Sequence, residues 1–345
     1  MRTILNTVGT SLLTNAAREL GGAEPDEKAL FNYLARIAPE LASAETNALA
    51  KLRQEGDRLI FLHSSTEQGR LCAHVLCRHY RSQKTNCDLM AVNDLSYQES
   101  RFKMRGLRSL IDTMIRLIRE EQKKGAEVVL NATGGFKAEI AYATLIGLLF
   151  DVPVYYIHEA FQEIIEMPPI PIAWDYAILA EHEDFFSWIE EEPRKTDAVD
   201  ERLKCLPREI RFLLFEEEGF TYLSPTGGVF YAAFEHLLSK AADHPVSLSA
   251  DARRAWQGME APVRIRFERE MEKLRSPVLR RSGSDQVRNC DCLVYPKGHR
   301  DERIFFFEAE ETVYVCELSR HSNKSYERLI DKGVLRKNYD AFSAL

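Results

Sequence analysis

Short apolar runs alternate with longer segments of helical period through the first half of the chain. The longest such segment, residues 26–54, repeats apolar residues every three to four positions, and Pro39 is expected to break or kink it. Strands that alternate with helices and have almost continuously apolar cores predict a mostly parallel sheet covered on both faces. The expected strands are residues 2–8, 58–63, 126–130 and 152–158, and the other expected helices are about 67–80, 100–124 and 138–149.

The pattern changes near residue 180. Helical segments rich in aromatic and acidic residues follow, which predicts a helical connector. The last part of the chain begins with charged helical segments and continues with three β-like runs separated by turns short enough for hairpins, so we expect a small α+β domain with an antiparallel sheet. The three runs are residues 285–295, 302–307 and 312–318. The predicted division of the chain is 1–178, 179–245 and 246–345.

Composition and charge narrow the class of protein. A chain of 345 residues accommodates two domains, and no apolar run approaches the roughly 20 residues of a membrane-spanning helix. The net charge is −7, but residues 251–345 hold 19 basic and 16 acidic residues, so the acidic excess lies in the first 250 residues. Such a protein is a poor sequence-independent binder of nucleic acid. The seven scattered cysteines suit reduced thiols, and the N-terminus lacks a signal-peptide pattern, so we expect a cytoplasmic protein.

Three loops rich in Gly, Ser or Thr follow predicted strands, at residues 7–11, 63–66 and 131–137. Ligands bind in open α/β sheets where strands end and loops lead into helices. In the third loop, a Gly-Gly turn lets the backbone approach a ligand, and the following helix offers unpaired N–H groups. Lys137 stands in the first helical turn, where the helix dipole disfavours a cation unless an anion is also bound. The alternative is a plain strand-to-helix turn with a solvated lysine.

Residues 3–15 and 131–139, with the spacing between them, resemble the CARF domain of CRISPR-associated proteins. The resemblance covers roughly residues 1–175. It implies a doubly wound, Rossmann-like domain that forms a homodimer and binds a cyclic oligoadenylate across the two-fold axis, with cyclic tetra-adenylate as the expected activator. Some CARF domains also cleave their ligand through its own 2′-hydroxyl, a reaction that Ser11 and Lys137 could align. The predicted ligand-binding residues are Gly9, Thr10, Ser11, Ser64, Asn131, Thr133, Gly134, Gly135 and Lys137.

The C-terminal part lacks the motifs of two common nuclease classes. No suitable Arg precedes a His at the spacing of HEPN nucleases, and the strand around Glu317 ends without the Lys of the PD-(D/E)xK pattern. Residues 245–330 instead resemble the RelE superfamily of toxins, in which a sheet ends in a strand followed by a basic and aromatic cluster. The resemblance implies a metal-independent endoribonuclease that cuts messenger RNA within the ribosome.

The candidate catalytic residues follow from that resemblance. Arg303 begins the middle strand, Arg320 ends the last strand, and Tyr326 lies six residues further, while Lys297 lies in the preceding hairpin. His321 and Lys324, within the cluster, are additional candidates. Arginines suit the charge that develops on a phosphate during attack by a 2′-hydroxyl, and the other residue types suit proton transfer. The alternative is a solvated, aggregation-resistant sheet edge.

The sequence therefore predicts a ribosome-dependent mRNA endoribonuclease that is activated by cyclic oligoadenylate in type III CRISPR antiviral signalling. Its expected partners are a second copy of the chain, the cyclic nucleotide, the ribosome and messenger RNA, with no metal cofactor and no membrane. Two alternatives remain open. One is a ligand-responsive transcription regulator, because CARF domains also precede winged-helix domains. The other is a stand-alone ring nuclease that degrades cyclic tetra-adenylate.

Overall fold

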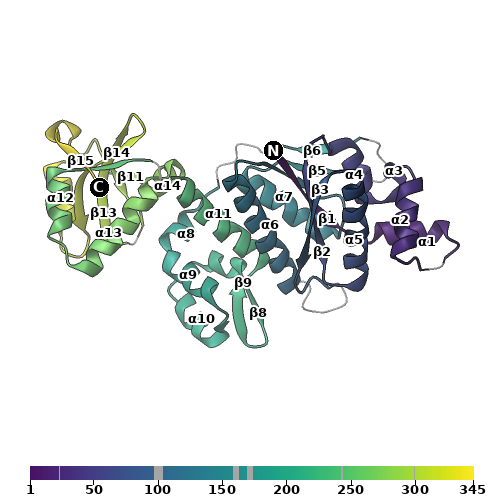
Figure 1. Ribbon diagram of the computed structural model, residues 1–345. Coiled ribbons are helices and arrows are strands. Elements are labelled where there is room, and N and C mark those ends of the chain that lie inside the picture. The colour runs from purple at the N-terminus through teal and green to yellow at the C-terminus, as the bar shows by residue number, and fades with distance from the viewer. Residues whose placement is uncertain (23, 97–103, 158–162, 169–173, 242–243, 299) are drawn as a thin grey trace. The chain divides into compact units, whose positions relative to one another are not determined.

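The computed structural model describes the chain apart from residues 23, 97–103, 158–162, 169–173, 242–243 and 299. Two compact units are present (Figure 1). The N-terminal unit comprises residues 1–172, 193–203 and 207–232, and the C-terminal unit comprises residues 173–192, 204–206 and 233–345. The predicted division into residues 1–178, 179–245 and 246–345 is finer than these units and stays a prediction.

The N-terminal unit contains a six-stranded sheet in the order β3-β2-β1-β4-β5-β6. The first five strands along the chain are parallel, and β6 is antiparallel to β5 at the edge, which confirms the predicted mostly parallel sheet. Strand β3 was missed because it lies at the other edge, where its half-exposed residues lack a continuous apolar run. The strands are β1 (Arg2–Val8), β2 (Arg58–Ser64), β3 (Asn86–Val92), β4 (Glu127–Asn131), β5 (Val154–Tyr156) and β6 (Ile165–Met167).

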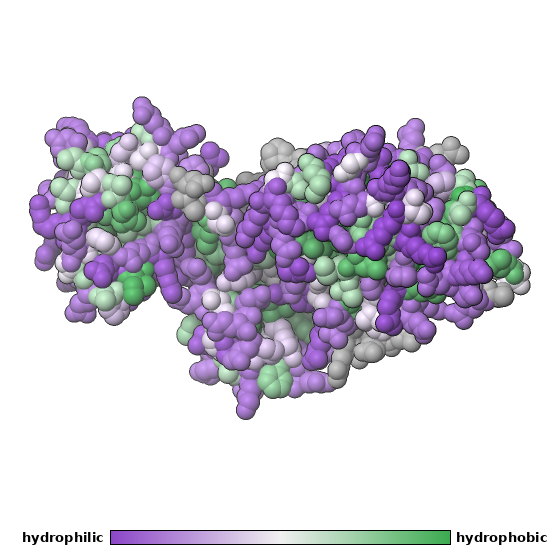
Figure 2. Space-filling view, in the orientation of Figure 1, coloured by the Kyte–Doolittle hydropathy of each residue, from purple (hydrophilic) through white to green (hydrophobic). Residues whose placement is uncertain are grey.

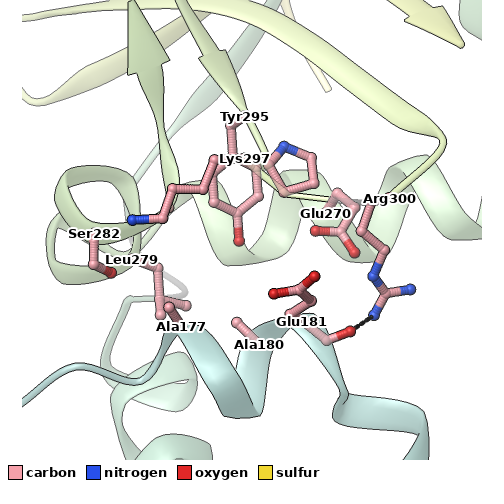
Figure 3. A pocket seen from close by; sticks show the side chains of 11 residues that line it. Ala177, Ala180, Glu181, Glu270, Leu279, Ser282, Tyr295, Lys297 and Arg300 are labelled. Atoms are coloured by element: carbon pink, nitrogen blue, oxygen red, sulfur yellow. Dashed lines mark hydrogen bonds between the residues drawn. The ribbon is translucent and has the colours of Figure 1, made fainter. Parts of the chain in front are cut away.

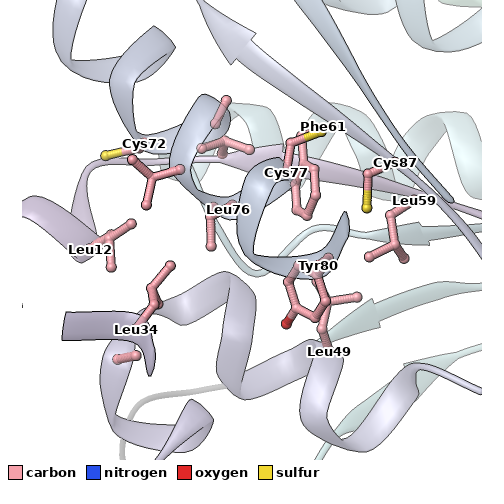
Figure 4. Close-up of a cluster of buried hydrophobic side chains, with 14 of the residues drawn as sticks. Leu12, Leu34, Leu49, Leu59, Phe61, Cys72, Leu76, Cys77, Tyr80 and Cys87 are labelled. Carbon is pink, nitrogen blue, oxygen red and sulfur yellow. The ribbon is translucent and has the colours of Figure 1, made fainter. Parts of the chain in front are cut away.

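Helices cover both faces of this sheet, with α4 and α5 on one side and α6 and α7 on the other (Figure 1). A buried cluster lies between the sheet and the helices on the side of α4 and α5, and it includes Leu12, Phe61, Leu76 and Tyr80 (Figure 4). The helices are α1 (Ser11–Glu19), α2 (Glu27–Arg36), α3 (Pro39–Ala42), α4 (Ala44–Leu52), α5 (Glu67–Ser82), α6 (Arg105–Lys123) and α7 (Lys137–Phe150). The predicted start of α6 at residues 100–103 and the predicted end of a strand at residue 158 lie outside the described residues.

Pro39 breaks the long helix expected at residues 26–54, as predicted. It opens the short helix α3, and Ser43 then caps a separate helix α4. The Ser43 hydroxyl accepts a hydrogen bond from the Thr46 N–H, while the Thr46 hydroxyl accepts one from the Ser43 N–H. This reciprocal cap satisfies two N–H groups that a helix start otherwise leaves open. The cap fixes the start of α4 and therefore the position of Glu45, which lies in the first turn of that helix.

The predicted helical connector also contains a small three-stranded sheet, in the order β7-β9-β8. Its hairpin turns at Glu218 and Gly219, which both adopt positive φ, at 52° and 80°. The acidic and aromatic residues before the turn suggested a helix, but a short 3-10 segment leads into the hairpin instead. The elements are α8 (Ala177–Glu181), α9 (Glu183–Glu191), β7 (Arg194–Lys195), α10 (Thr196–Leu203), η2 (Arg208–Leu213), β8 (Leu214–Glu217), β9 (Phe220–Leu223) and α11 (Pro225–Ala241).

The C-terminal unit contains a second six-stranded sheet, in the order β11-β12-β13-β14-β10-β15. Strands β11 to β14 form an antiparallel meander, which confirms the predicted α+β part, and β10 pairs with β14 in parallel. The sequence did not predict β10, β15 or α15, because each is short. The elements are β10 (Val246–Ser249), α12 (Ala250–Gln257), α13 (Ala261–Leu274), α14 (Pro277–Gly283), β11 (Asp285–Gln286), β12 (Leu293–Tyr295), β13 (Glu302–Ala309), β14 (Thr312–Arg320), α15 (Ser325–Lys332), η3 (Arg336–Asn338) and β15 (Phe342–Ala344).

The visible surface is mainly hydrophilic, with apolar residues in small patches (Figure 2). Within the described part of the chain, no helix combines the length and apolar character that crossing a bilayer requires.

Candidate functional sites

The two predicted ligand loops meet at the centre of the N-terminal sheet. Strands β1 and β4 are neighbours, and Asn6, near the carboxyl end of β1, pairs with Asn131 at the carboxyl end of β4. From this pair the sheet continues in opposite directions, to β2 on one side and β5 on the other, so the loops lie at the topological switch point. The backbones are in close contact, because a Cβ placed on Gly9 would lie 2.8 Å from the Gly135 nitrogen.

The Gly134-Gly135 pair is required by the local geometry. Gly135 adopts a φ of 96°, which L side chains rarely adopt, and a Cβ there would collide with the Glu139 carboxylate. A Cβ on Gly134 would meet the Glu45 carboxylate and would lie 2.5 Å from the Thr7 carbonyl oxygen. Both glycines therefore allow the loop to approach its neighbours.

Asn131 and Thr133 form hydrogen bonds inside the protein. The Asn131 amide donates to the Asn6 side-chain oxygen at 2.9 Å, and its own oxygen accepts from the Thr133 hydroxyl at 2.7 Å. The Thr133 hydroxyl also accepts from the Ile157 N–H at 3.2 Å. Because these groups already have partners, the two side chains hold the loop in shape. Their direct contact with a ligand stays a prediction.

Glu45 contacts the first ligand loop, which the sequence did not predict. Its side chain is fully buried at the start of α4. One carboxylate oxygen accepts from the Gly9 N–H at 2.8 Å, and the other lies 3.4 Å from the Ser11 hydroxyl. The same hydroxyl accepts from the Ala44 N–H at 3.1 Å. Glu45 and the start of α4 therefore hold the first ligand loop, and no sequence spacing signals this long-range contact.

The remaining predicted ligand residues differ in exposure. Thr10 is half-buried, whereas Lys137 is exposed in the first turn of α7, beside an exposed Phe136 ring. Ser64 is buried at the end of β2, where its hydroxyl hydrogen-bonds the Thr66 hydroxyl at 2.7 Å. Thr66 in turn caps α5, so Ser64 supports a helix start, and its contact with a ligand stays a prediction.

Several candidate catalytic residues of the C-terminal unit lie together. Arg303 on β13 pairs with Ser319, beside Arg320 at the end of β14. The Tyr326 ring, on α15, lies 5.5 Å from the Arg303 guanidinium and 5.6 Å from the centre of the His321 ring. Residues from two strands and a helix thus form one cluster, which we call the basic cluster: Arg303, Arg320, His321 and Tyr326. Lys324 is exposed just before α15, with a φ of 58°.

Asp301 anchors the basic cluster and was missed from the sequence. Its carboxylate accepts from Arg320 at 2.7 Å and from the N–H and hydroxyl of Ser322 at 2.7 and 3.0 Å. Burial opposes ionisation, but the hydrogen bonds from Ser322 and Arg320 outweigh it and lower the pKa of Asp301. Arg320 is therefore held beside a carboxylate, with its side chain 34% exposed.

Arg303 is buried and donates to backbone carbonyls. Its guanidinium hydrogen-bonds the carbonyl oxygens of Gly298, at 2.7 Å, and of Glu302 and Arg300. These contacts close the turn between β12 and β13. Arg303 is thus the buried member of the cluster. Arg320 and His321 lie at its open, solvent-exposed side, since the His321 side chain is exposed.

Lys297 lines a separate small cavity in the C-terminal unit (Figure 3). The cavity has a volume of about 30 Å³, enough for one or two water molecules but too small for a nucleotide. The Tyr295 hydroxyl and the Glu181 and Glu270 carboxylates point into it (Figure 3). Burial raises the pKa of Glu270 and raises that of Tyr295 well above its usual range.

A buried lysine, Lys273, contacts Ala180 and Glu270, two of the residues that line this cavity. Lys273 is 2% exposed and donates to the Ala180 carbonyl at 2.8 Å, to Glu270 at 3.0 Å and to Glu183 at 2.8 Å. Arg300 also donates to the Glu181 carbonyl at 2.7 Å. The region is therefore a structural ion network that fastens α8 and α9 to α13. Among the described residues, no three His, Cys, Asp or Glu side chains gather as a metal site.

The N-terminal unit is thus a doubly wound α/β domain with glycine-rich loops at its switch point, the arrangement typical of nucleotide- and phosphate-binding domains. Residues 40–170 match a family model described as CRISPR-associated protein (Cas_APE2256). This match, which includes β4 and the second ligand loop, makes the N-terminal unit similar to CRISPR-associated proteins.

Two solved structures are also similar. Can2 from Sulfobacillus thermosulfidooxidans in complex with cyclic tetra-adenylate is 14% identical over 70% of this chain and 67% of that chain, with a TM-score of 0.26. Enterococcus italicus Csm6 bound to cyclic hexa-2′-fluoro-hexa-dAMP is 9% identical over 100% of this chain and 78% of that chain, with a TM-score of 0.30. Likenesses this distant do not define a function.

Proposed function

We propose that this protein is a ribonuclease that a cyclic oligoadenylate activates in type III CRISPR antiviral defence. The observation that carries the proposal is the meeting of the two glycine-rich loops, through Gly9 and Gly135, at the switch point of the N-terminal sheet. The match of residues 40–170 to a CRISPR-associated family supports a nucleotide signal as the ligand.

The ligand would lie against both loops. Lys137 and the N–H groups at the start of α7 supply positive charge for a phosphate, and Thr10 and Ser11 supply hydroxyl groups. A cyclic tetra-adenylate has two-fold symmetry, so an isologous homodimer presents the same loops to each half of the ring. A homodimer with one shared ring is therefore part of the proposal.

The output would be RelE-like cleavage of messenger RNA on the ribosome. The basic cluster supports this role, because it brings together residues of β13, β14 and α15 that the sequence resemblance selected. In the reaction, the ribose 2′-oxygen bonds to phosphorus as the bond to the 5′-oxygen breaks. The phenolate form of Tyr326 takes the 2′-hydroxyl proton, Arg320 stabilises the charge on the phosphate, and the protonated ring of His321 gives a proton to the leaving 5′-oxygen.

The two alternatives predict different surfaces. A winged-helix regulator places its hairpin against nucleic acid. The β8–β9 hairpin instead carries Glu216, Glu217 and Glu218, and their negative charges repel phosphates. A ring nuclease needs a hydroxyl and a cation at the ligand loops, and Ser11 and Lys137 have those chemical groups. We therefore keep ligand cleavage as a second activity of the N-terminal unit.

One experiment separates these functions. The purified protein is incubated with labelled cyclic tetra-adenylate, with and without translating ribosomes, and both the messenger RNA and the labelled ring are analysed. We expect messenger RNA cleavage only when ring and ribosomes are both present. Cleavage of free RNA without ribosomes, or no cleavage despite ring binding, would contradict the RelE-like output. Breakdown of the ring alone would identify a ring nuclease.

A further inference from the structure

Helix α15 carries its charged side chains in two rows. Arg328 and Lys332 are one helical turn apart, about 6 Å along the axis, and Lys324 lies one turn before them at the N-cap. All three residues are exposed, and we call them the cation row. The exposed residues Glu327 and Asp331 are also four positions apart and form a second, acidic row beside the first. Opposite charges are therefore separated on this helix instead of interleaved.

The cation row faces solvent. Tyr326, Leu329 and Ile330 lie on the opposite side of α15 and pack against the buried cluster that contains Cys292 and Phe305. With 3.6 residues per turn, the cation row lies roughly 150° around the helix from these three side chains. A ligand can therefore reach the row without displacing the core of the unit.

The two rows differ in their partners. The Glu327 carboxylate lies 3.6 Å from Nδ1 of His321, and the Asp331 carboxylate pairs with Arg288 at 3.1 Å. Each carboxylate of α15 thus has a basic neighbour from outside the helix. Within the part of the chain that the structure describes, no carboxylate forms an ion pair with the cation row.

This separation of charge costs helix stability. Like charges four residues apart repel each other on a helix, as Lys324 and Arg328, Arg328 and Lys332, and Glu327 and Asp331 do. Alternating signs at the same positions would turn the repulsion into attraction, so the stability of α15 does not explain the row. A polyanion bound to the row would offset the repulsion between its cations.

We propose that the cation row binds the phosphate backbone of an RNA strand beside the basic cluster. This inference rests on the proposed function and adds the surface that holds the RNA away from the reacting phosphate. The row adjoins the cluster, because Tyr326 on the same helix lies 5.5 Å from the Arg303 guanidinium. Arginine can pair with a phosphate through two hydrogen bonds, and lysine meets it as a point charge. Since the whole chain has a net charge of −7, attraction to RNA has to come from such a local surface.

The test measures binding of a short, fluorescently labelled single-stranded RNA by anisotropy at several salt concentrations. The RNA carries 2′-O-methyl groups, so it cannot be cleaved through its own 2′-hydroxyl groups. Arg328→Gln and Lys332→Gln should each reduce the slope of log affinity against log salt by about 0.7, and the double variant by about 1.4, because each removes one phosphate contact. Lys324 is left unchanged, since it is also a candidate catalytic residue.

A matched control removes the same charge from the other face of the sheet. Arg254 on α12 has 79% of its side chain exposed. Helix α12 packs through Ala252 on the face of the sheet that carries Ile304 and Val315, whereas α15 packs on the face that carries Phe305. Arg254→Gln should therefore bind RNA with the wild-type slope. Thermal unfolding of each variant checks that the fold is intact.

The outcomes separate the inference from the function on which it rests. Binding of RNA with the expected loss of slope, but no cleavage of messenger RNA on ribosomes, would contradict the proposed function and leave the inference standing. If the double variant binds with the wild-type slope, or if the wild type does not bind RNA at low salt, the cation row is not an RNA-binding surface. Cleavage by the wild type would then still support the proposed function.

A competition experiment distinguishes RNA from an acidic protein as the occupant. Polyglutamate of the same total charge is added to the complex of the wild type with labelled RNA. We expect it to displace the RNA less effectively than unlabelled RNA does, because its carboxylates carry less charge per group than a chain of phosphates offers in hydrogen-bond acceptors. Equal displacement would overturn the assignment to RNA and favour an acidic protein partner.

Discussion

The Glu45 carboxylate accepts a hydrogen bond from the Gly9 backbone N–H at 2.8 Å, across 36 residues of sequence. The contact holds the first ligand loop from a fully buried position at the start of α4. It also occupies an N–H group that a phosphate would otherwise use. In the proposed ligand site, the first loop would therefore contribute shape and hydroxyl groups, and the second loop carries an exposed cation, Lys137.

Two substitutions of Glu45 separate its hydrogen bond from its charge. Glu45→Gln keeps an oxygen acceptor for Gly9 and removes a negative charge near a polyanionic ligand, so it should bind cyclic tetra-adenylate at least as tightly as the wild type. Glu45→Ala leaves the Gly9 N–H without its acceptor and should lower the free energy of unfolding by about 1–3 kcal/mol. Denaturant unfolding and calorimetry measure both effects. Equal stability of Glu45→Ala and the wild type would contradict the assigned role.

Gly135→Ala should destabilise the protein through both backbone strain and a collision. Gly135 has a φ of 96°, and a new Cβ would meet the Glu139 carboxylate. The strain alone costs about 1–2 kcal/mol in a left-handed conformation. Gly125→Ala is a matched control, because Gly125 has a φ of 74° with open space around it. Gly135→Ala should lower the midpoint of urea unfolding more than Gly125→Ala, and equal shifts would rule out the collision.

The sequence predicted much of the fold because that information is local. The apolar runs of β1, β2 and β4 are buried on both faces, and Pro39 marks a helix break by its chemistry alone. The ligand loops were predicted because glycines mark close approaches. In contrast, Glu45 and Asp301 act on residues brought near them only by folding. Their sequence neighbours resemble ordinary helix and turn residues.

The sequence also did not show that two basic residues, Arg303 and Lys273, are buried. Arg303 was predicted as a catalytic residue, which stays a prediction, and the sequence did not show that its guanidinium donates to carbonyl oxygens of the preceding turn. Lys273 lies in one of the predicted charged helical segments and is buried among two carboxylates and a carbonyl. Residue type and helical period indicate where a charge lies along a helix. They do not show what the folded chain places opposite it.

Lys273→Met should be strongly destabilising. It leaves the Glu270 carboxylate buried without its cation, and removing one partner of a buried ion pair costs about 3–5 kcal/mol. The double variant Lys273→Met, Glu270→Leu should recover part of that loss, because both charges are gone. Arg269→Ala is the control, since Arg269 pairs with Asp184 at 3.1 Å with 57% of its side chain exposed, and it should cost less than about 1 kcal/mol. Similar losses for Lys273→Met and Arg269→Ala would contradict the buried network.

Asp301 should make stability depend on pH in the acid range. Its pKa is lower in the folded protein than the unfolded value of about 3.9, so its contribution is present above that value and is lost as the pH falls through the folded pKa. Asp301→Asn should therefore lose less stability than the wild type between about pH 5 and pH 3. Urea unfolding at each pH measures the difference. If the free energies of unfolding of the two proteins changed equally with pH, the contacts with Arg320 and Ser322 would not stabilise the ionised form of Asp301.

Arg320→Ala should abolish most of the ligand-activated cleavage while leaving ring binding intact. The Arg320 guanidinium lies at the open side of the basic cluster, held by Asp301 at 2.7 Å, where it can meet the phosphate of a bound RNA. Loss of one donor to a developing negative charge lowers a rate by about 10²–10³-fold. Cleavage of messenger RNA on translating ribosomes is measured with saturating cyclic tetra-adenylate, beside calorimetry of the ring. Arg288→Ala is the control, because Arg288 is an exposed arginine of the same unit that pairs with Asp331, outside the cluster. If both variants cleave equally well, the basic cluster is not the catalytic site.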